Sequence, residues 1–451
     1  MAAAPLVATA KLPLDRLLSL FADVQRGEGG RLLLLTFNVF LILTAYYVMK
    51  PVREALILAQ PGGAEIKSYS MALQAVLLVA IVPAYGALAG KLSRRRLINA
   101  VTAFFLACLP VFYLAAEARW QVGVPFFLWI GIFSLMVIAQ FWAYANDLYS
   151  PDAGKRLFAV IAFGASSGAV FGAWISGHLI GELGVHAMLL VAAVILAASL
   201  MLFNLIDARE RNQPVIGRGA TDEQAPIGDG NAFALVLRNR YLLLVAALVL
   251  LLNWVNATGE YILSSIVQRA AEEQVAAGTL SREAEGAFIG AFYAEYFQVV
   301  NIAGMLLQLF LVSRIVKLIG VHAAVCILPI VAFGSYAIAA LQPSLAVVRW
   351  VKTAENSVDY SLQNTVKQML FLPTTREEKY KAKQVTDSFV VRAGDVLSSA
   401  TVFIGTAVLA LGTTQFALIN VVLVSAWLVV AVLVGREFRR RTEAQAAKGA
   451  T

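Results

Sequence analysis

The stretch of sequence that decides the fold is Tyr46-Tyr47-Val48-Met49-Lys50-Pro51-Val52-Arg53-Glu54-Ala55-Leu56-Ile57-Leu58. It follows an uncharged run from Leu32 to Met49 and leads back into apolar sequence, so its charges lie within a segment long enough to cross a bilayer. Ionisable groups inside a spanning helix usually face a protein-lined cavity, because facing lipid is costly. We therefore expect this stretch to form part of a functional site.

Pro51 separates the two cations of this stretch. A proline removes one backbone donor and kinks a helix, and the freed carbonyl must then meet protein or water. In an alternative interpretation, Lys50 and Arg53 lie near the outer interface, ~27 Å from Leu32 at 1.5 Å per residue, and extend their charges to the headgroups.

The composition excludes a soluble globule. The 451 residues are 60% hydrophobic and 14% charged, which predicts an all-α integral membrane protein. The net charge of +8 comes from Lys and Arg residues between the apolar runs, a pattern typical of membrane proteins, so we expect no nucleic-acid partner. The two cysteines, Cys108 and Cys326, lie in apolar runs and suggest neither a disulfide framework nor a metal site.

Apolar length predicts about twelve transmembrane helices in two six-helix halves. The expected spans are 32–58, 69–90, 97–117, 124–147, 157–180, 187–206, 240–268, 286–312, 320–341, 344–371, 384–411 and 415–435. The gaps rich in Lys and Arg alternate with sparsely charged ones, which predicts that both termini are cytoplasmic.

A polar segment rich in Gly and Pro splits the chain into these halves. The expected division is a cytoplasmic N-terminal segment 1–30, an N-terminal half 31–206, a cytoplasmic linker 207–235, a C-terminal half 236–436 and a basic cytoplasmic tail 437–451. Two-half membrane proteins are often alternating-access transporters, whose halves rock about a site near the bilayer midplane.

Small residues recur at four-residue spacing in the fifth span, at Gly164, Gly168, Gly172 and Ser176. Such a ridge permits close helix approach. We favour a packing role over ligand contact, and in a transporter a smooth ridge also lets helices slide.

The tenth span carries Lys352, Glu355 and Asp359 at a spacing that places them on one helical face. This helix is expected to line a polar cavity; the alternative is an amphipathic helix in the cytosol. Further candidate substrate-binding residues are Asn146, Lys155, Lys367 and Arg392, and candidate coupling or gating residues are Glu54, Glu260, Glu295, Asp387 and Asp395. These charges indicate either an ionic solute or internal salt bridges that exchange between inward and outward states.

Catalytic motifs are missing from the sequence. There is no Gly-x-x-x-x-Gly-Lys-Ser/Thr phosphate loop, so ATP hydrolysis is not expected as an energy source. The three histidines lack metal-ligand spacing. We expect no enzymatic activity, no cofactor and no metal.

Three sequence blocks together indicate a family. The first contains Phe37-Asn38, Lys50-Pro51-Val52-Arg53-Glu54-Ala55-Leu56 and Gly63-Ala64-Glu65-Ile66; the second contains Phe141-Trp142-Ala143-Tyr144-Ala145-Asn146, Lys155-Arg156-Leu157-Phe158 and Gly164-Ala165; the third contains Lys367-Gln368-Met369, Leu372-Pro373, Lys379, Lys381, Lys383, Asp387, Arg392 and Gly394. In this order they resemble the ATP/ADP translocases of plastids and obligate intracellular bacteria, a branch of the major facilitator superfamily.

The chain departs from this family at three positions. An acidic residue of the fourth span is replaced near Ile130, and Gly394-Asp395-Val396 stands where the family has Gly-Lys-Ser. The segment from Asn253 to Glu260 lacks the lysine of the family's seventh span. The resemblance is therefore that of a divergent member.

The resemblance implies a secondary transporter of a bacterial inner membrane that exchanges ATP for ADP. Lys50 and Arg53 would meet the phosphates of this small anionic substrate, with Lys155 and Lys367 as further contacts. The alternative is a proton-coupled major-facilitator-type carrier of another polar or anionic solute, in which Glu260, Glu295 or Asp395 would titrate. A membrane enzyme or sensor is a third class. We expect a monomer in the lipid bilayer.

Overall fold

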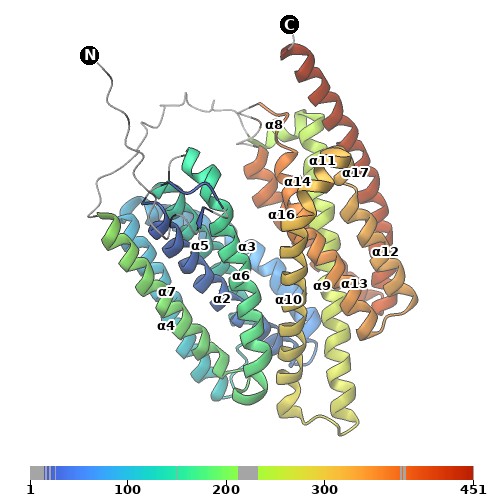
Figure 1. The fold of residues 1–451 in the computed structure, drawn as a ribbon. Coiled ribbons are helices and arrows are strands. Elements are labelled where there is room, and N and C mark those ends of the chain that lie inside the picture. Colours follow the sequence, from blue (N-terminus) through green and yellow to red (C-terminus); the bar gives the residue numbers. More distant parts are fainter. Residues whose placement is uncertain are drawn as a thin grey trace, which may run out of the picture. The chain divides into compact units, whose positions relative to one another are not determined.

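The computed structural model describes residues 15, 18–19, 22–25, 27–149, 151–211, 232–375, 378 and 382–449. Over these residues the regular structure is helical, as Figure 1 shows. Most of the expected N-terminal segment 1–30 and most of the expected linker 207–235 lie outside the described residues.

Six long helices cover the first six predicted spans. They are α2 (Gly29–Leu58), α3 (Gly63–Lys91), α4 (Arg94–Glu117), α5 (Gly123–Leu148), α6 (Pro151–Leu183) and α7 (Ala187–Arg211). Helix α2 continues through Pro51 as one element.

The rest of the described chain is also helical. Its α-helices are α8 (Ala232–Arg238), α9 (Arg240–Ala276), α10 (Glu285–Phe310), α11 (Val312–Ala324), α12 (Ile327–Leu341), α13 (Leu345–Val358), α14 (Asn364–Met369), α16 (Val391–Phe403) and α17 (Thr413–Gly449). A 3-10 turn, η1 (Arg282–Ala284), precedes α10, and three π-helical segments, η2 (Asp359–Gln363), η3 (Val385–Val390) and η4 (Ile404–Val408), interrupt the tenth and eleventh predicted spans.

Helices cover most of each predicted span, although the expected span 320–341 is divided between the end of α11 and α12, and the predicted all-α membrane fold is confirmed. By length and hydropathy, 9 described helices could cross a membrane, or up to 10 if α10 and α11, bent by 74° to each other, count as one span. The other two predicted spans do not meet this test. Helices α12 and α13 have only 15 and 14 residues, and α13 also carries Arg349, Lys352 and Glu355. The cytoplasmic placement of the termini stays a prediction.

Local sequence explains where several of these helices begin. The Asn239 side chain accepts hydrogen bonds from Tyr241 N and Leu242 N at the start of α9, and Ser344 caps α13 by accepting from Val347 N. Helix α11 contains a break at Gly320, whose φ of 73° lies in the left-handed region that glycine tolerates.

The described residues form two compact units. The first unit draws on 1–50, 86–120 and 130–224, and the second on 51–85, 121–129 and 225–451. The boundaries pass through α2, α3 and α5, so single helices contribute to both units. The division into two six-helix halves stays a prediction.

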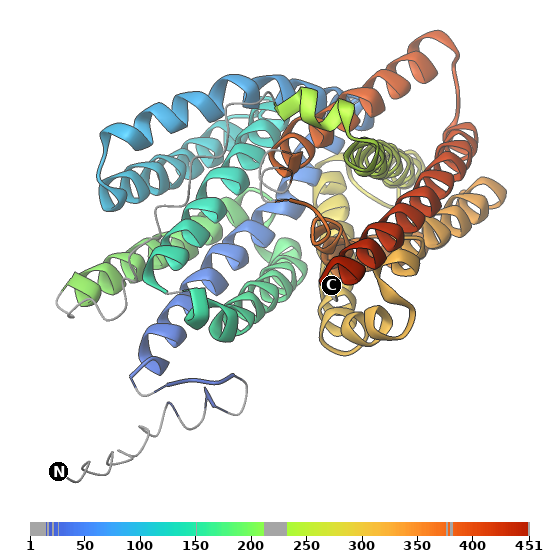
Figure 2. The same ribbon diagram turned by 90° about the horizontal axis from the view of Figure 1, so that it is seen from above.

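In the first unit, α4 and α7 lie side by side (Figures 1 and 2), and α6 packs on the first part of α2. A Cβ atom at Gly168 would collide with the carbonyl oxygen of Phe40, and one at Gly172 with that of Thr44. One turn further, Ser176 Oγ donates a hydrogen bond to Val48 O at 3.1 Å. The predicted close approach along the small-residue ridge is confirmed.

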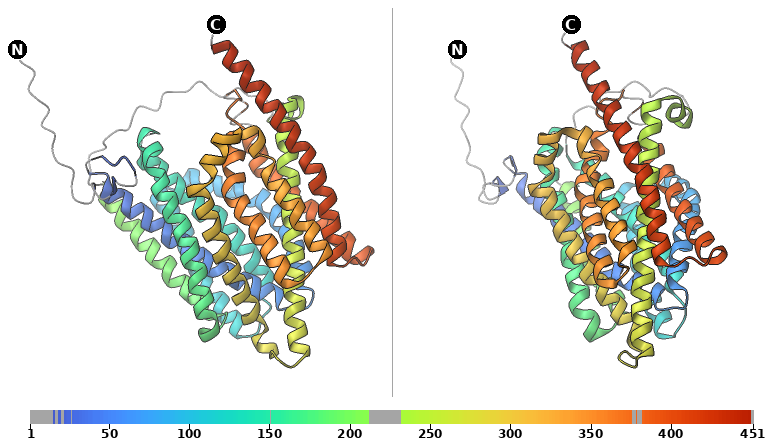
Figure 3. Two further views of the ribbon diagram at one scale, coloured as in Figure 1. Left: turned by 45° about the vertical axis from the view of Figure 1, so that its right-hand side comes forward. Right: turned by 90° about the vertical axis from the view of Figure 1, so that its right-hand side faces the viewer.

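In the second unit, the long C-terminal helix α17 packs along α9 and α12 (Figure 3). Helix α9 also contacts α10, α13 and α16, so it is the central helix of this unit. It carries Asn256 and Glu260 among residues that are mostly buried.

Candidate functional site

The second unit contains a chain of buried ion pairs that begins on α2. Arg53 Nε donates a hydrogen bond to Glu54 Oε1 at 2.9 Å, and the two side chains form an ion pair. The other oxygen of this carboxylate lies 2.7 Å from Lys67 Nζ, on α3. Glu54 is fully buried, so both of its cations are needed to offset the loss of hydration.

The chain of charges continues onto α9 and α13 through Glu260. Lys67 Nζ lies 3.9 Å from Glu260 Oε2, and Lys352 Nζ lies 3.7 Å from Glu260 Oε1. Lys352 also pairs with Glu355 at 3.2 Å, one turn along α13. We call these six residues (Arg53, Glu54, Lys67, Glu260, Lys352 and Glu355) the charge chain; cations and carboxylates alternate along it, and their charges sum to zero.

Neutral side chains of α9 complete the surroundings of the two lysines. Lys67 Nζ donates to Ser264 Oγ at 2.8 Å, and Lys352 Nζ donates to Asn256 Oδ1 at 3.1 Å. Each ammonium group can donate three hydrogen bonds, which the carboxylates and these acceptors share.

The carboxylates also receive neutral donors. Tyr336 Oη, on α12, donates to Glu355 Oε1 at 2.9 Å. The Asn356 amide nitrogen donates to Glu260 Oε1 at 3.1 Å and to Tyr296 Oη at 2.7 Å. Ionised carboxylates are acceptors only, so these donors favour the charged forms of both glutamates.

Aromatic rings accompany the cations. The guanidinium of Arg53 lies 4.9 Å from the ring centroid of Phe127, and Lys67 Nζ lies 5.4 Å from that of Tyr293. In the first unit, Lys50 Nζ lies 4.8 Å from the ring centroid of Tyr47. Lys50 is buried, so the geometry favours a protein-lined environment over extension to the headgroups.

Exposure differs sharply along the charge chain. The side chains of Arg53 and Glu260 are 17% and 21% exposed, whereas those of Lys67 and Lys352 are 3% and 2% exposed. A solute would therefore reach one cation and one carboxylate before the two lysines.

Other predicted site residues form separate pairs. Lys367 lies 3.7 Å from Asp387, and Arg392 donates to Asp395 at 2.9 Å. Glu295 pairs with Arg349 at 3.0 Å.

The remaining predicted residues lie apart from these pairs. Asp359 begins η2 and is half-buried, and Asn146 is exposed near the end of α5. Lys155 lies in α6, but its side chain is outside the described residues.

Sequence reasoning missed Lys67. It lies in the first turns of α3, where a lysine ordinarily lies at the membrane interface, so it was not predicted to be a site residue. The available signal was that Glu65 and Lys67 are the last charges in α3 before Lys91. Asn256 and Asn356 are not among the predicted site residues, because side-chain partners on other helices are not visible in a sequence.

Gly259 leaves room for this arrangement. A Cβ atom there would collide with the Tyr336 hydroxyl and lie 3.0 Å from Lys352 Nζ. The neighbouring Glu260 can therefore approach α13 closely because residue 259 has no side chain.

Two further features bear on what the site can hold. In the part of the chain that the structure describes, no group of three or more His, Cys, Asp or Glu side chains could hold a metal ion.

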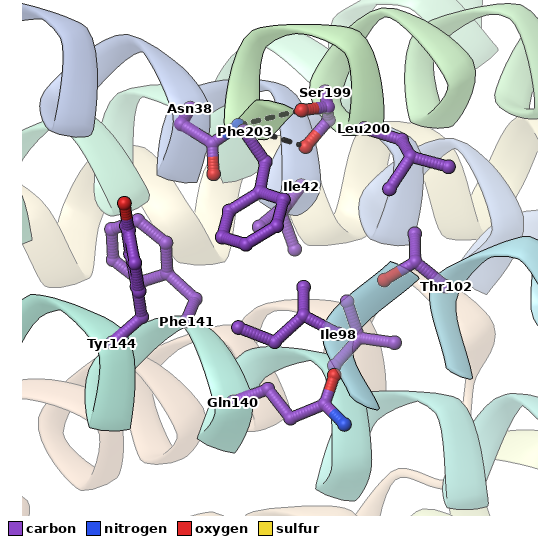
Figure 4. A pocket seen from close by; sticks show the side chains of 11 residues that line it. Asn38, Ile42, Ile98, Thr102, Gln140, Phe141, Tyr144, Ser199, Leu200 and Phe203 are labelled. Carbon is purple, nitrogen blue, oxygen red and sulfur yellow. Dashed lines mark hydrogen bonds between the residues drawn. The ribbon is translucent and has the colours of Figure 1, made fainter. Parts of the chain in front are cut away.

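A cavity in the first unit, lined by residues such as Asn38, Gln140 and Phe203, has room for about one water molecule (Figure 4). The Asn38 amide donates to Ser199 O at 2.8 Å beside it. The charge chain is the better candidate for a polar solute.

A multi-pass helical fold that buries a charge-balanced polar cluster is typical of secondary transporters. A sequence profile of the Major Facilitator Superfamily matches residues 32–351, and the chain belongs to this superfamily.

Comparison with individual proteins confirms the resemblance inferred from the motifs. The chain is 24% identical over 458 residues to ADP,ATP carrier protein 1 of Chlamydia muridarum, covering 86% of this chain and 84% of the relative. It is 25% identical over 457 residues to ADP,ATP carrier protein 1 of Chlamydia trachomatis serovar D, with the same coverage.

Solved structures share the fold. A bacterial homologue of the human lysosomal transporter Spinster, inward-facing and unoccupied, has a TM-score of 0.59 at 14% identity, covering 91% of this chain and 98% of that chain. The nucleoside transporter NupG has a TM-score of 0.60 at 13% identity, with coverages of 91% and 99%. The protein is thus a multi-pass membrane protein with a transporter fold.

Proposed function

We propose that the protein is a secondary transporter of a bacterial inner membrane that exchanges nucleotides, ATP against ADP, by alternating access. The observation that carries this proposal is the match to ADP,ATP carrier proteins over 86% of the chain. The buried cations of the charge chain support it, since phosphate oxygens are the acceptors that Lys and Arg bind best.

In this proposal Lys50 and Arg53 contact the phosphates from neighbouring turns of α2. Lys352 adds a third cation, which Glu355 orients through their ion pair, and Asp359 at the start of η2 is a further proposed substrate contact. Asn146, Lys155, Lys367 and Arg392 are proposed as further contacts along the path, and Glu54, Glu260, Glu295, Asp387 and Asp395 as coupling or gating groups.

No covalent chemistry is needed for such an exchange. The gradients of the two nucleotides supply the driving force, and we propose a carrier without enzymatic activity. Each cation that releases a phosphate needs another partner, and the neighbouring carboxylates provide one.

The test is uptake of labelled ATP into proteoliposomes preloaded with ADP. Uptake should require internal nucleotide and should fall at least about tenfold in both Lys50→Ala and Arg53→Ala, since each loses a charge-assisted contact worth about 1.5–3 kcal/mol. Lys317→Ala, which removes an exposed lysine of α11, is the matched control and should transport normally.

A different result identifies a different carrier. Uptake of another solute that depends on a pH gradient and not on nucleotides would replace this proposal with a proton-coupled carrier of another polar or anionic solute. Equal activity of the parent and both α2 variants would remove Lys50 and Arg53 from the phosphate site while leaving the exchange itself in place.

A further inference from the structure

The two buried lysines of the charge chain share one carboxylate. Glu260 presents one oxygen to Lys67 and the other to Lys352, at 3.9 and 3.7 Å. Each lysine also keeps a closer carboxylate of its own, since Glu54 lies 2.7 Å from Lys67 and Glu355 lies 3.2 Å from Lys352. Glu260 is therefore the carboxylate of the charge chain that lies farthest from its cations.

Glu260 is also the most exposed carboxylate of the charge chain, with 21% of its side chain accessible against at most 3% for Glu54 and Glu355. An anion that arrives from the accessible side would meet this carboxylate before it met either lysine. Since the six charges sum to zero, the cluster offers such an anion no net attraction unless a carboxylate moves away.

An unused acceptor lies beside Glu260. Asn356 is buried, and its amide nitrogen donates to Glu260 and to Tyr296. Its Oδ1 atom has no hydrogen-bond partner within the described part of the chain. A buried acceptor without a partner is costly, so this atom suits a ligand that donates a hydrogen bond.

We propose that Lys67 and Lys352 form an anion subsite and that Glu260 occupies this subsite until a phosphate group of the substrate displaces it. The inference rests on the proposed function and adds a residue, Lys67, and a mechanism of release. A phosphate outcompetes the carboxylate because it carries up to two charges and three acceptor oxygens. When the phosphate leaves, Glu260 returns to the lysines and restores the charge balance of the cluster.

The ligand class follows from the groups present. The subsite takes a phosphate, Arg53 lies at the accessible end for a second one, and Asn356 Oδ1 takes a hydroxyl or amino donor. A nucleoside di- or triphosphate carries all of these groups in one molecule.

The experiment is equilibrium binding of labelled ATP to the purified full-length protein in lipid nanodiscs. Glu260→Gln keeps the size of the side chain and an oxygen for Asn356 but removes the competing charge. It should bind ATP at least about tenfold more tightly than the parent, equivalent to about 1.4 kcal/mol. Glu443→Gln removes a carboxylate from an exposed pair with Arg439 and should leave the affinity unchanged.

A second variant removes the subsite without leaving a net charge. In the double variant Lys67→Met with Glu54→Gln, one cation and its carboxylate are lost together, so folding is less at risk than in Lys67→Met alone. This variant should bind ATP at least about tenfold more weakly. Unchanged or weaker binding by folded Glu260→Gln would overturn the displacement mechanism, and parent-like binding by the double variant would remove Lys67 from the site.

Failure of the nucleotide assignment is distinguishable from failure of this inference. If the parent binds neither ATP nor ADP, the proposed function falls, and the same variants are titrated with inorganic pyrophosphate. Tighter pyrophosphate binding by Glu260→Gln would support the inference that Glu260 competes with anions for the two lysines, whatever the anion is. Absence of pyrophosphate binding, or binding that the substitution does not tighten, would overturn it as well.

Discussion

The two ends of α2 make opposite kinds of contact. Between Phe40 and Val48 the helix meets the small residues of α6 so closely that Gly168 and Gly172 have no room for a Cβ atom. At Glu54 it meets Lys67 of α3 through an ion pair, beside the neighbouring Arg53. The first contact depends on size and the second on charge compensation, so substitutions should damage them in different ways.

The largest effect is expected where a buried charge loses its partner. Lys352→Met leaves Glu355 and Glu260 with fewer cations and should destabilise the protein by about 3–5 kcal/mol. The double variant Lys352→Met with Glu355→Gln removes the charges as a pair and should regain most of that loss. Thermal unfolding of both variants in detergent measures the difference; equal melting temperatures would show that charge compensation does not govern this contact.

The packing contact should respond to volume alone. Gly168→Leu forces a side chain against the backbone of Phe40 and should cost about 1–3 kcal/mol, through displaced helices rather than lost charge. Gly181→Leu is the control on the same helix, because its Cβ atom would meet no atom within 4 Å. If the two variants melt together, the ridge is not a tight contact in the membrane protein.

Gly259→Ala joins the two effects, because a methyl group there would press on charged and polar groups at once. We expect a modest loss of stability, of about 1 kcal/mol, together with a fall in transport of about tenfold. Gly334→Ala on α12, whose Cβ atom would lie in open space, is the control. The measurement is the uptake rate of each variant at matched protein levels. Wild-type transport by Gly259→Ala would show that the charge chain tolerates displacement.

The smallest effect is expected at an exposed ion pair. Arg439 and Glu443 pair at 2.8 Å on α17, but their side chains are 66% and 64% exposed. Glu443→Ala should change stability by less than about 0.5 kcal/mol, since water and salt screen the pair. A loss comparable to that of Lys352→Met would mean that burial is not what separates the two kinds of charge.

Patterns that depend on a single helix were predictable. Apolar runs predicted the long helices that could cross a membrane, because burial in lipid requires length and hydrophobicity, and both can be read from the sequence. The spacing of Gly164 to Ser176 predicted a close helix contact, and Lys352 with Glu355 was predicted to share a face, which their ion pair confirms. The motif blocks predicted relatives among ATP/ADP translocases, which the comparisons confirm.

Patterns that depend on two helices were not predictable in the same way. The π-helical segments η2 and η3 begin at Asp359 and Val385, and no local sequence pattern predicted that these turns would be wider than α-helical turns. The predicted site residues Lys367, Asp387, Arg392 and Asp395 form two pairs of their own, apart from the charge chain.

By itself, the sequence determined that this protein is a helical membrane protein with charges inside its spans, since hydropathy and charge placement are properties of each segment. Only the tertiary structure decided which charges meet. Lys67 joined the site, and Glu260 came to lie between two lysines, because α3, α9 and α13 pack together from distant parts of the chain. Partner choice between buried ions depends on distances of a few ångströms, which helix packing sets and sequence spacing does not.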